Sequence, residues 1–131
     1  EGVEKQTLDE LFASNDIISL HCPLTPSTKN IICRESIAKM KPSAIVVNTG
    51  RGPLVDEADM AEALKSGRIA AYATDVMCQE PPQVDNPLFG CENAFITPHL
   101  AWGSIEARER LMGIALENVR QFVNNTPVNE V

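Results

Sequence analysis

Several features are missing from this sequence, and each absence excludes a class of protein. No run of about 18 consecutive apolar residues occurs, so the sequence offers no candidate for a membrane-spanning helix. The first residues lack the pattern of a secretory signal peptide. Lysine and arginine number 11 against 18 aspartates and glutamates, which gives a formal net charge of -7 and not the basic surface of a nucleic-acid-binding protein. We therefore expect neither a membrane nor a nucleic acid among the partners.

Cysteine is present, but never in the C-x-x-C spacing of a redox motif or a zinc site. The four cysteines are Cys22, Cys33, Cys78 and Cys91. We interpret them as reduced thiols that pack as small apolar side chains, which is typical of a cytoplasmic protein. A zinc site made of His21, Cys22 and His99 matches no known ligand spacing, so we predict no metal.

A complete dinucleotide fingerprint, G-x-G-x-x-G, is also missing. Its nearest match is residues 50–55, which have the first two glycines but Val55 in the third position. Pro53 in addition lacks the N–H that a pyrophosphate-binding turn would use. We interpret this segment as a loop that presents Arg51 to a carboxylate or a phosphate. A solvated arginine in an ordinary strand-to-helix connection is the alternative.

Strands and helices alternate along the chain. Apolar runs predict strands over residues 16–20, 45–47, 69–76 and 94–97. Capping signals and apolar spacing predict helices over residues 7–14, 34–40, 56–66 and 104–124, followed by an extended tail over 127–131. This order predicts an α/β fold with a parallel sheet, and the length of 131 residues suits one domain.

Ionisable side chains follow three of the predicted strands. Arg51 follows the second strand, Glu80 the third and His99 the fourth. The carboxyl ends of parallel strands share one edge of a sheet, where α/β proteins bind ligands, so these groups could converge in one cleft. Arginine can hold a carboxylate, histidine can transfer a proton near neutral pH, and a carboxylate beside the histidine would fix its tautomer. The set suits proton transfer at the hydroxyl or carbonyl of a small carboxylic acid.

Motifs along the whole chain resemble those of the NAD(P)-dependent D-isomer-specific 2-hydroxyacid dehydrogenases. The motifs are residues 48–57, Asp75-Val76 with Glu80-Pro81-Pro82, Asn86-Pro87-Leu88 and Thr97-Pro98-His99-Leu100. The resemblance implies a Rossmann-type NAD(P)-binding domain. Within the family, Pro53, Trp102 and residues 106–110 are most similar to glycerate dehydrogenases, also called hydroxypyruvate reductases.

The resemblance also implies a role for each matching position. In the family pattern Arg51 binds the substrate carboxylate and carbonyl, His99 is the acid/base, and Glu80 is its partner. The cofactor-binding positions that it implies are Cys22, Thr49, Gly50 and Asp75, the last on the nicotinamide side. The implied reaction is hydride transfer between a nicotinamide ring, from NAD or NADP, and C2 of a small 2-hydroxy or 2-oxo acid. Family members are commonly homodimers through this domain.

The sequence departs from the family pattern in two respects. The first cofactor half, with its fingerprint and the acid that reads the ribose, has no counterpart here. We therefore expect an incomplete domain, the carboxyl-terminal part of a longer enzyme, that is inactive alone. The second departure is residues 71–74, AYAT, where the family usually has a glycine-bearing run, so that the bulk of Tyr72 puts the packing on the cofactor side in question.

Alternative functions remain open at this point. Another substrate of the same family, such as phosphoglycerate or a longer 2-oxo acid, would use the same motifs. A cofactor-sensing regulator is the alternative from a different class, because transcriptional corepressors share this fold and these motifs. The sequence does not discriminate between NAD and NADP.

Overall fold

The computed structural model describes residues 4–130. The chain divides into two compact units, Glu1–His99 and Leu100–Val131, and each is described by itself. Residues 1–3 and 131, which belong to the start of the predicted domain and the end of the predicted tail, lie outside the described residues. No helix in the described part is both long and apolar enough to cross a membrane.

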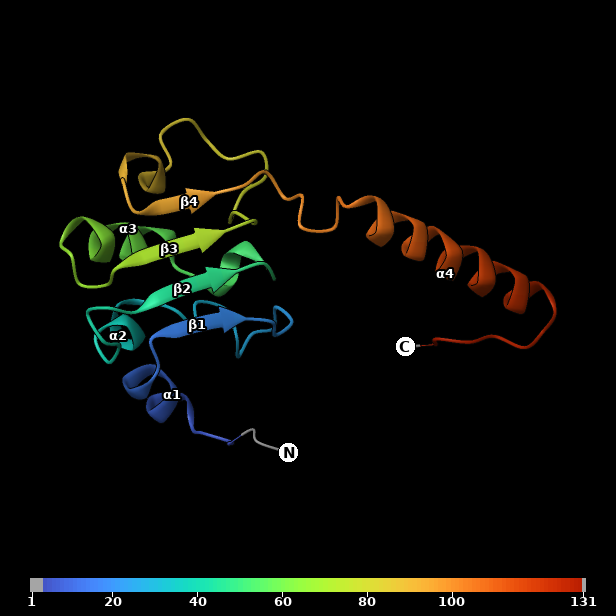
Figure 1. Ribbon diagram of the computed structural model, residues 1–131, viewed down its shortest axis with the longest axis horizontal. Coiled ribbons are helices and arrows are strands. Elements are labelled where there is room, and N and C mark those ends of the chain that lie inside the picture. The colour runs from blue at the N-terminus through green and yellow to red at the C-terminus, as the bar shows by residue number, and fades with distance from the viewer. Residues whose placement is uncertain (1–3, 131) are drawn as a thin grey trace. The chain divides into compact units, whose positions relative to one another are not determined.

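The first unit is built on a four-stranded parallel sheet (Figure 1). Its strands are β1 (Ile17–Leu20), β2 (Ile45–Asn48), β3 (Ala71–Thr74) and β4 (Ala94–Ile96), in the spatial order β1-β2-β3-β4. Leu20, Asn48, Thr74 and Ile96 are aligned across the sheet, so all four strands end at nearly the same level. The predicted parallel α/β sheet is confirmed, and its carboxyl edge gathers the loops that follow the strands.

The helices begin where the capping signals predict. They are α1 (Leu8–Ser14), α2 (Arg34–Ile37), α3 (Glu57–Lys65) and α4 (Ile105–Val123), with short 3-10 helices η1 (Gly52–Leu54) and η2 (Pro87–Gly90). Thr7, Asp56 and Ser104 cap α1, α3 and α4 through their side-chain oxygens. In the second unit, α4 confirms the long helix predicted over 104–124.

Two elements are shorter than the sequence predicts. The helix expected over residues 34–40 ends at Ile37, and the backbone then tightens, with the amides of Lys39 and Met40 bonding the carbonyls three residues earlier. Pro42 prevents the helix from extending past residue 41, because a proline disfavours the helical conformation of the residue before it. The strand expected over 69–76 is regular from Ala71 to Thr74, with one further backbone bond at each end, from Ala70 to Ala44 and from Asp75 to Asn48.

One face of the sheet forms the core with the helices. Ile18, Val46 and Tyr72 are aligned on this face, and all three are at most 4% exposed. They belong to one apolar cluster with residues of α1, α2 and α3. Tyr72, whose bulk put the packing of this strand in question, is therefore packed in the core of the helix-covered face. On the opposite face Ile17 and Phe95 are 65% and 62% exposed.

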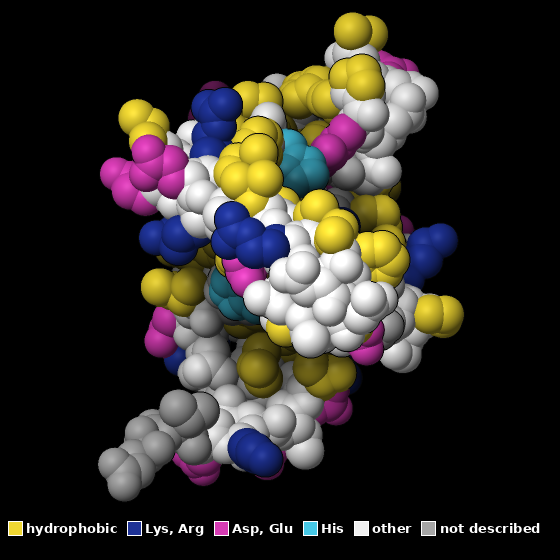
Figure 2. All heavy atoms as spheres, turned by 90° about the vertical axis from the view of Figure 1, so that its right-hand side faces the viewer, with side chains coloured by type: hydrophobic (Ala, Val, Ile, Leu, Met, Phe, Trp, Pro, Cys, Tyr) yellow, Lys and Arg dark blue, Asp and Glu magenta, His cyan; other side chains and the backbone are white. Residues whose placement is uncertain are grey.

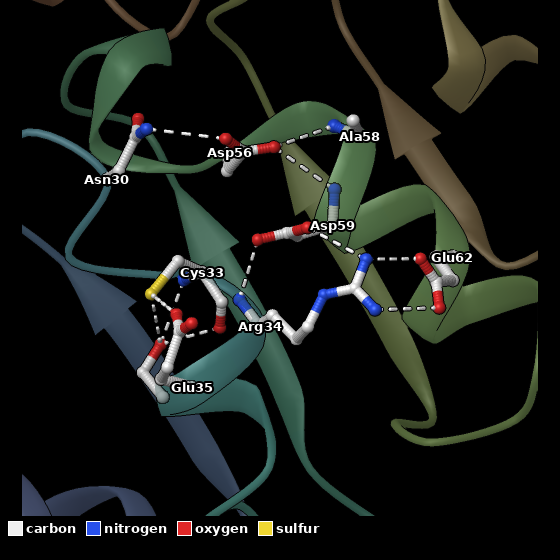
Figure 3. A network of polar contacts seen from close by, with 9 residues as sticks. Asn30, Cys33, Arg34, Glu35, Asp56, Ala58, Asp59 and Glu62 are labelled. Atoms are coloured by element: carbon white, nitrogen blue, oxygen red, sulfur yellow. Dashed lines mark hydrogen bonds and ion pairs between the residues drawn. The ribbon is translucent and has the colours of Figure 1, made fainter.

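Polar contacts fix the start of α3 and join it to α2 (Figure 3). The Asp56 carboxylate accepts hydrogen bonds from the amides of Ala58 and Asp59. Arg34 of α2 donates its backbone N–H to Asp59 and its guanidinium to both carboxylate oxygens of Glu62, at 2.6 and 3.2 Å. Exposed pairs of this kind stabilise a fold by at most about 1 kcal/mol, so the network mainly sets the position of α3.

Candidate functional site

The side chains of the candidate site come from loops at the carboxyl edge of the sheet. Asp75 follows β3 directly, and Thr97, Pro98 and His99 follow β4. His99 has a positive φ of 51°, a left-handed conformation in which histidine is enriched among residues other than glycine. Because β3 and β4 are parallel neighbours, the two loops leave the sheet side by side.

Glu80 and His99 are in direct contact. The Nδ1 atom of His99 lies 2.6 Å from Oε2 of Glu80, and the other carboxylate oxygen accepts the Met77 amide at 2.9 Å. The His99 bond, and after it the Met77 bond, hold the pKa of the Glu80 carboxyl below its ordinary value. Both side chains are partly exposed, and Figure 2 shows a histidine beside an acidic side chain at the surface. The pair is therefore open to a ligand and ordered by two bonds.

A pocket of about 440 Å³ lies beside this pair. Its polar lining residues are Asp75, Glu80, Thr97 and His99, and its apolar ones are Met77, Pro81, Pro82, Phe89, Ile96 and Pro98. Asp75 is only 5% exposed, and its carboxylate accepts a hydrogen bond from the Thr97 hydroxyl. Apolar walls with a few converging polar groups are typical of a small-molecule site.

The Arg51 loop is shaped by a buried asparagine at the end of β2. Asn48, which is 0% exposed, accepts the Gly50 amide at 3.1 Å and donates to the Arg51 carbonyl at 2.9 Å. The Arg51 side chain is exposed, and its Nη1 donates to the Gly50 carbonyl at 2.8 Å. Arg51 does not line the pocket, so of the three predicted catalytic groups the structure brings together Glu80 and His99, with Arg51 on the loop after the neighbouring strand β2.

Gly52 joins the Arg51 loop to the segment that carries Glu80. A Cβ atom at this position would lie 2.1 Å from the carbonyl carbon and oxygen of Met77 and 2.4 Å from the amide nitrogen of Cys78. No side chain fits in that space, so glycine is required for the backbones to touch. The contact fixes the separation of the two loops.

The remaining predicted positions lie along the same edge. Cys22 follows β1 and packs against the core, and Thr49 and Gly50 follow β2. His21, considered above as a metal ligand, pairs through Nε2 with the Ser19 hydroxyl at 2.8 Å. Among residues 4–130 no group of three or more histidine, cysteine or acidic side chains could hold a metal ion.

Two polar residues of the site were missed by reasoning from the sequence alone. Asn48 shapes the Arg51 loop, and Thr97 bonds Asp75. The position of Asn48 at the end of an apolar run was a signal that could have been used. A polar side chain buried at a strand end usually has a hydrogen-bond partner, and here that partner is the adjoining loop. Thr97 belongs to a motif of the family resemblance, but its bond to Asp75 could not be read from the sequence, because it joins the ends of two different strands.

A parallel sheet with an imidazole–carboxylate pair and a pocket at its carboxyl edge defines a Rossmann-type, dehydrogenase-like domain. The family follows from the comparison with known proteins. Residues 1–101 match the family described as D-isomer specific 2-hydroxyacid dehydrogenase, NAD binding domain, and the chain belongs to this family. The Rossmann-type fold predicted from the sequence is thereby confirmed.

Similar proteins extend this result. The hydroxypyruvate reductase of Blautia hydrogenotrophica is 50% identical over 124 residues, which are 95% of this chain and 38% of that enzyme. The glycerate dehydrogenase of Methylorubrum extorquens is 47% identical over 126 residues, 95% of this chain and 40% of that enzyme. Among solved structures, an acyclic imino acid reductase in complex with NADPH and D-Arg has a TM-score of 0.93 at 37% identity, over 100% of this chain and 42% of that one. The chain thus spans about two fifths of the length of these relatives.

Proposed function

We propose that this chain supplies the acid–base part of the active site in an oxidoreductase that acts on a small 2-hydroxy or 2-oxo acid. The substrate pair that we propose is glycerate and hydroxypyruvate. The observation that carries the proposal is the 2.6 Å contact between His99 and Glu80 beside the pocket. Membership of the dehydrogenase family and the similarity to a hydroxypyruvate reductase and a glycerate dehydrogenase support it.

The proposed role of His99 is to move the proton. Reduction of a carbonyl at C2 takes one hydride and one proton, and the nicotinamide ring of the cofactor, when bound, supplies the hydride. Because Glu80 bonds Nδ1, the proton passes from Nε2 of His99 to the carbonyl oxygen, which becomes the hydroxyl of the product. The Glu80 carboxylate, bonded to Nδ1, holds the ring in place and leaves Nε2 to face the substrate.

The proposed role of Arg51 is to hold the substrate carboxylate. Its planar guanidinium offers two parallel N–H donors, which match the two oxygens of a carboxylate. The backbone under it is fixed by Asn48, while the side chain is exposed and can rotate toward the pocket. Binding is therefore expected to draw the guanidinium away from the Gly50 carbonyl that it bonds here.

The residues present fit the nicotinamide end of a cofactor. Apolar walls suit the flat faces of the ring, and the buried Asp75 can accept a hydrogen bond from its carboxamide. We propose that Cys22, Thr49 and Gly50 lie along the rest of the cofactor, which is NAD or NADP. The 131 residues contain no pyrophosphate-binding fingerprint, so we propose that they are inactive without the remainder of the enzyme.

The proposal is tested by steady-state reduction of hydroxypyruvate with NADH or NADPH, using the full-length protein. Arg51→Ala is expected to raise KM for hydroxypyruvate at least tenfold, because the charged fork that holds the carboxylate is lost. Arg34→Ala removes a guanidinium that pairs with Glu62 between α2 and α3 and serves as the matched control. Equal kinetics for the two variants would contradict the role of Arg51.

The same assay separates the alternatives. Faster turnover of a phosphorylated or longer 2-oxo acid than of hydroxypyruvate would assign another substrate within the family. Tight nucleotide binding with negligible turnover on any 2-oxo acid would assign a cofactor-sensing regulator instead.

We further propose that the full-length enzyme is a cytoplasmic homodimer. The four cysteines, all free thiols in the structure, suit a reducing compartment. Light scattering coupled to size-exclusion chromatography of the full-length protein tests the dimer, and a monomer mass would contradict it.

A further inference from the structure

Glu57, the first residue of α3, ties down both ends of the loop that carries Glu80. One of its carboxylate oxygens accepts the Cys78 amide at 2.7 Å, and the other accepts Nδ2 of Asn86, also at 2.7 Å. These partners are 21 and 29 residues away in the sequence. Asn86 in turn bonds the Leu88 amide and so fixes the start of η2.

The Met77–Cys78 segment links this clamp to the acid–base pair. The Met77 amide bonds Glu80, and the next amide along the chain, that of Cys78, bonds Glu57. Gly52 packs against the peptide group between them. Two carboxylates and one close backbone contact thus set the orientation of two consecutive N–H groups. Any rotation of this segment turns the Met77 donor away from Glu80.

We propose that Glu57 is a positioning residue for the acid–base pair, acting through the Met77–Cys78 segment on Glu80 and His99. This inference rests on the proposed function for its kinetic consequences. The contacts themselves can be tested without turnover. Glu57 does not line the pocket, and its carboxylate oxygens bond the Cys78 amide and Asn86, so its effect on the pair passes through the loop.

The two N–H donors that Glu57 binds, on Cys78 and Asn86, explain why a carboxylate is needed at this position. Glutamate offers two acceptors to two donors, whereas glutamine offers one acceptor and one amide donor, which would face the amide donor of Asn86. Glu57→Gln therefore keeps the shape and breaks one bond. Adding Asn86→Asp restores a hydrogen bond in the opposite direction, because the side-chain amide introduced at position 57 then donates to the carboxylate introduced at position 86.

The first measurement is the Glu80 titration, followed by ¹³C NMR in the 131-residue chain. In the wild type the pKa of Glu80 lies below its ordinary value, because His99 and then the Met77 amide bond its carboxylate. We expect Glu57→Gln and Glu57→Ala to raise it toward that value, and the Glu57→Gln/Asn86→Asp double variant to lower it again. Glu62→Gln, on the same helix but paired with Arg34, is the matched control and should leave it unchanged.

The second measurement is the pH profile of kcat in the full-length enzyme. We expect Glu57→Ala to lower kcat about tenfold to a hundredfold and to move the acid limb to higher pH, since misplacement of a catalytic group by about 1 Å costs rates of this order. If Glu57 has only a structural role, its replacement lowers the melting temperature and leaves the Glu80 titration and the acid limb unchanged. That result overturns the proposal, as does a double variant in which the Glu80 titration does not recover. If the wild-type enzyme has no turnover, the proposed function fails, while the titration still decides the role of Glu57.

Discussion

The contact of Gly52 with the neighbouring loop gives a prediction that can be worked out from distances. A methyl group at this position would sit 2.1 Å from the carbonyl carbon and oxygen of Met77. Carbon atoms pack at about 3.5 Å, so Gly52→Ala must separate the two backbones by more than about 1 Å. The obstacle is backbone on both sides and cannot rotate away as a long side chain would.

Overpacking typically destabilises a protein by about 1 to 3 kcal/mol, and we expect the upper end here because the obstacle is backbone. A unit of the size of Glu1–His99 loses about 4 to 8 °C for each kcal/mol. We therefore expect Gly52→Ala to lower the melting temperature, followed by circular dichroism, by roughly 12 °C or more. Gly90→Ala is the control, because its nearest atoms are the end of the Lys65 side chain at 3.9 Å, and it should change stability by less than about 0.5 kcal/mol. A Gly52→Ala protein as stable as the Gly90→Ala protein would refute the close contact between the loops.

Further predictions follow from the polar groups of the site. The bonds to His99 and Met77 lower the pKa of Glu80 in the folded state. Its ionised form therefore stabilises the fold at a pH above the ordinary pKa of 4.5, and this contribution to stability is lost as the pH falls through the lowered pKa. Urea denaturation from about pH 7 to pH 3 should accordingly show a shallower acid loss of stability for Glu80→Gln than for the wild type, and parallel curves would contradict this. Burial, and after it the charge of Glu57, raises the pKa of Cys78 from 9.0 to about 12. Iodoacetamide at about pH 8 should therefore modify Cys78 at least tenfold more slowly than an unstructured cysteine peptide, as peptide mass spectrometry can check, and equal rates would rule out the shift. Asn48→Ala strips the Gly50 amide and the carbonyl of the next residue of their partner, so it should lower the free energy of unfolding by about 2 kcal/mol and raise KM for the carboxylate substrate. An unchanged KM would show that this asparagine does not shape the substrate site.

The architecture followed from the sequence because its signals are local. A β-branched run such as 45–47, a capping box at Thr7 and Glu10, and Gly67 with its positive φ after α3 each specify an element within a few residues. The alternation of strands and helices then predicts a parallel sheet. In such a sheet the loops that follow the strands all lie at the same edge. Element ends were predicted less well, and α2 ends at Ile37 rather than at residue 40, where the chain continues as tighter turns.

The interior of the site depended on long-range contacts that no local pattern encodes. The pairing of Glu80 with His99 was a hypothesis from their places after two strands, and the structure contains that contact. The clamp made by Glu57 was not foreseen, because its partners lie 21 and 29 residues away and a capping position on a helix gives no hint of them. The orientation of the Arg51 side chain was not predicted either. An exposed side chain adopts a rotamer that local acceptors favour, and here the acceptor is the Gly50 carbonyl.

The most direct test of the central claim is the rate of hydroxypyruvate reduction by the full-length protein when His99 is replaced. His99→Gln keeps the size and polarity of the side chain but has no group that exchanges a proton near neutral pH. We expect kcat to fall by about a hundredfold to ten-thousandfold with cofactor affinity preserved, because a positioned acid contributes on this order. A His99→Gln enzyme that retains turnover within threefold of the wild type at its pH optimum would contradict proton transfer by the His99–Glu80 pair.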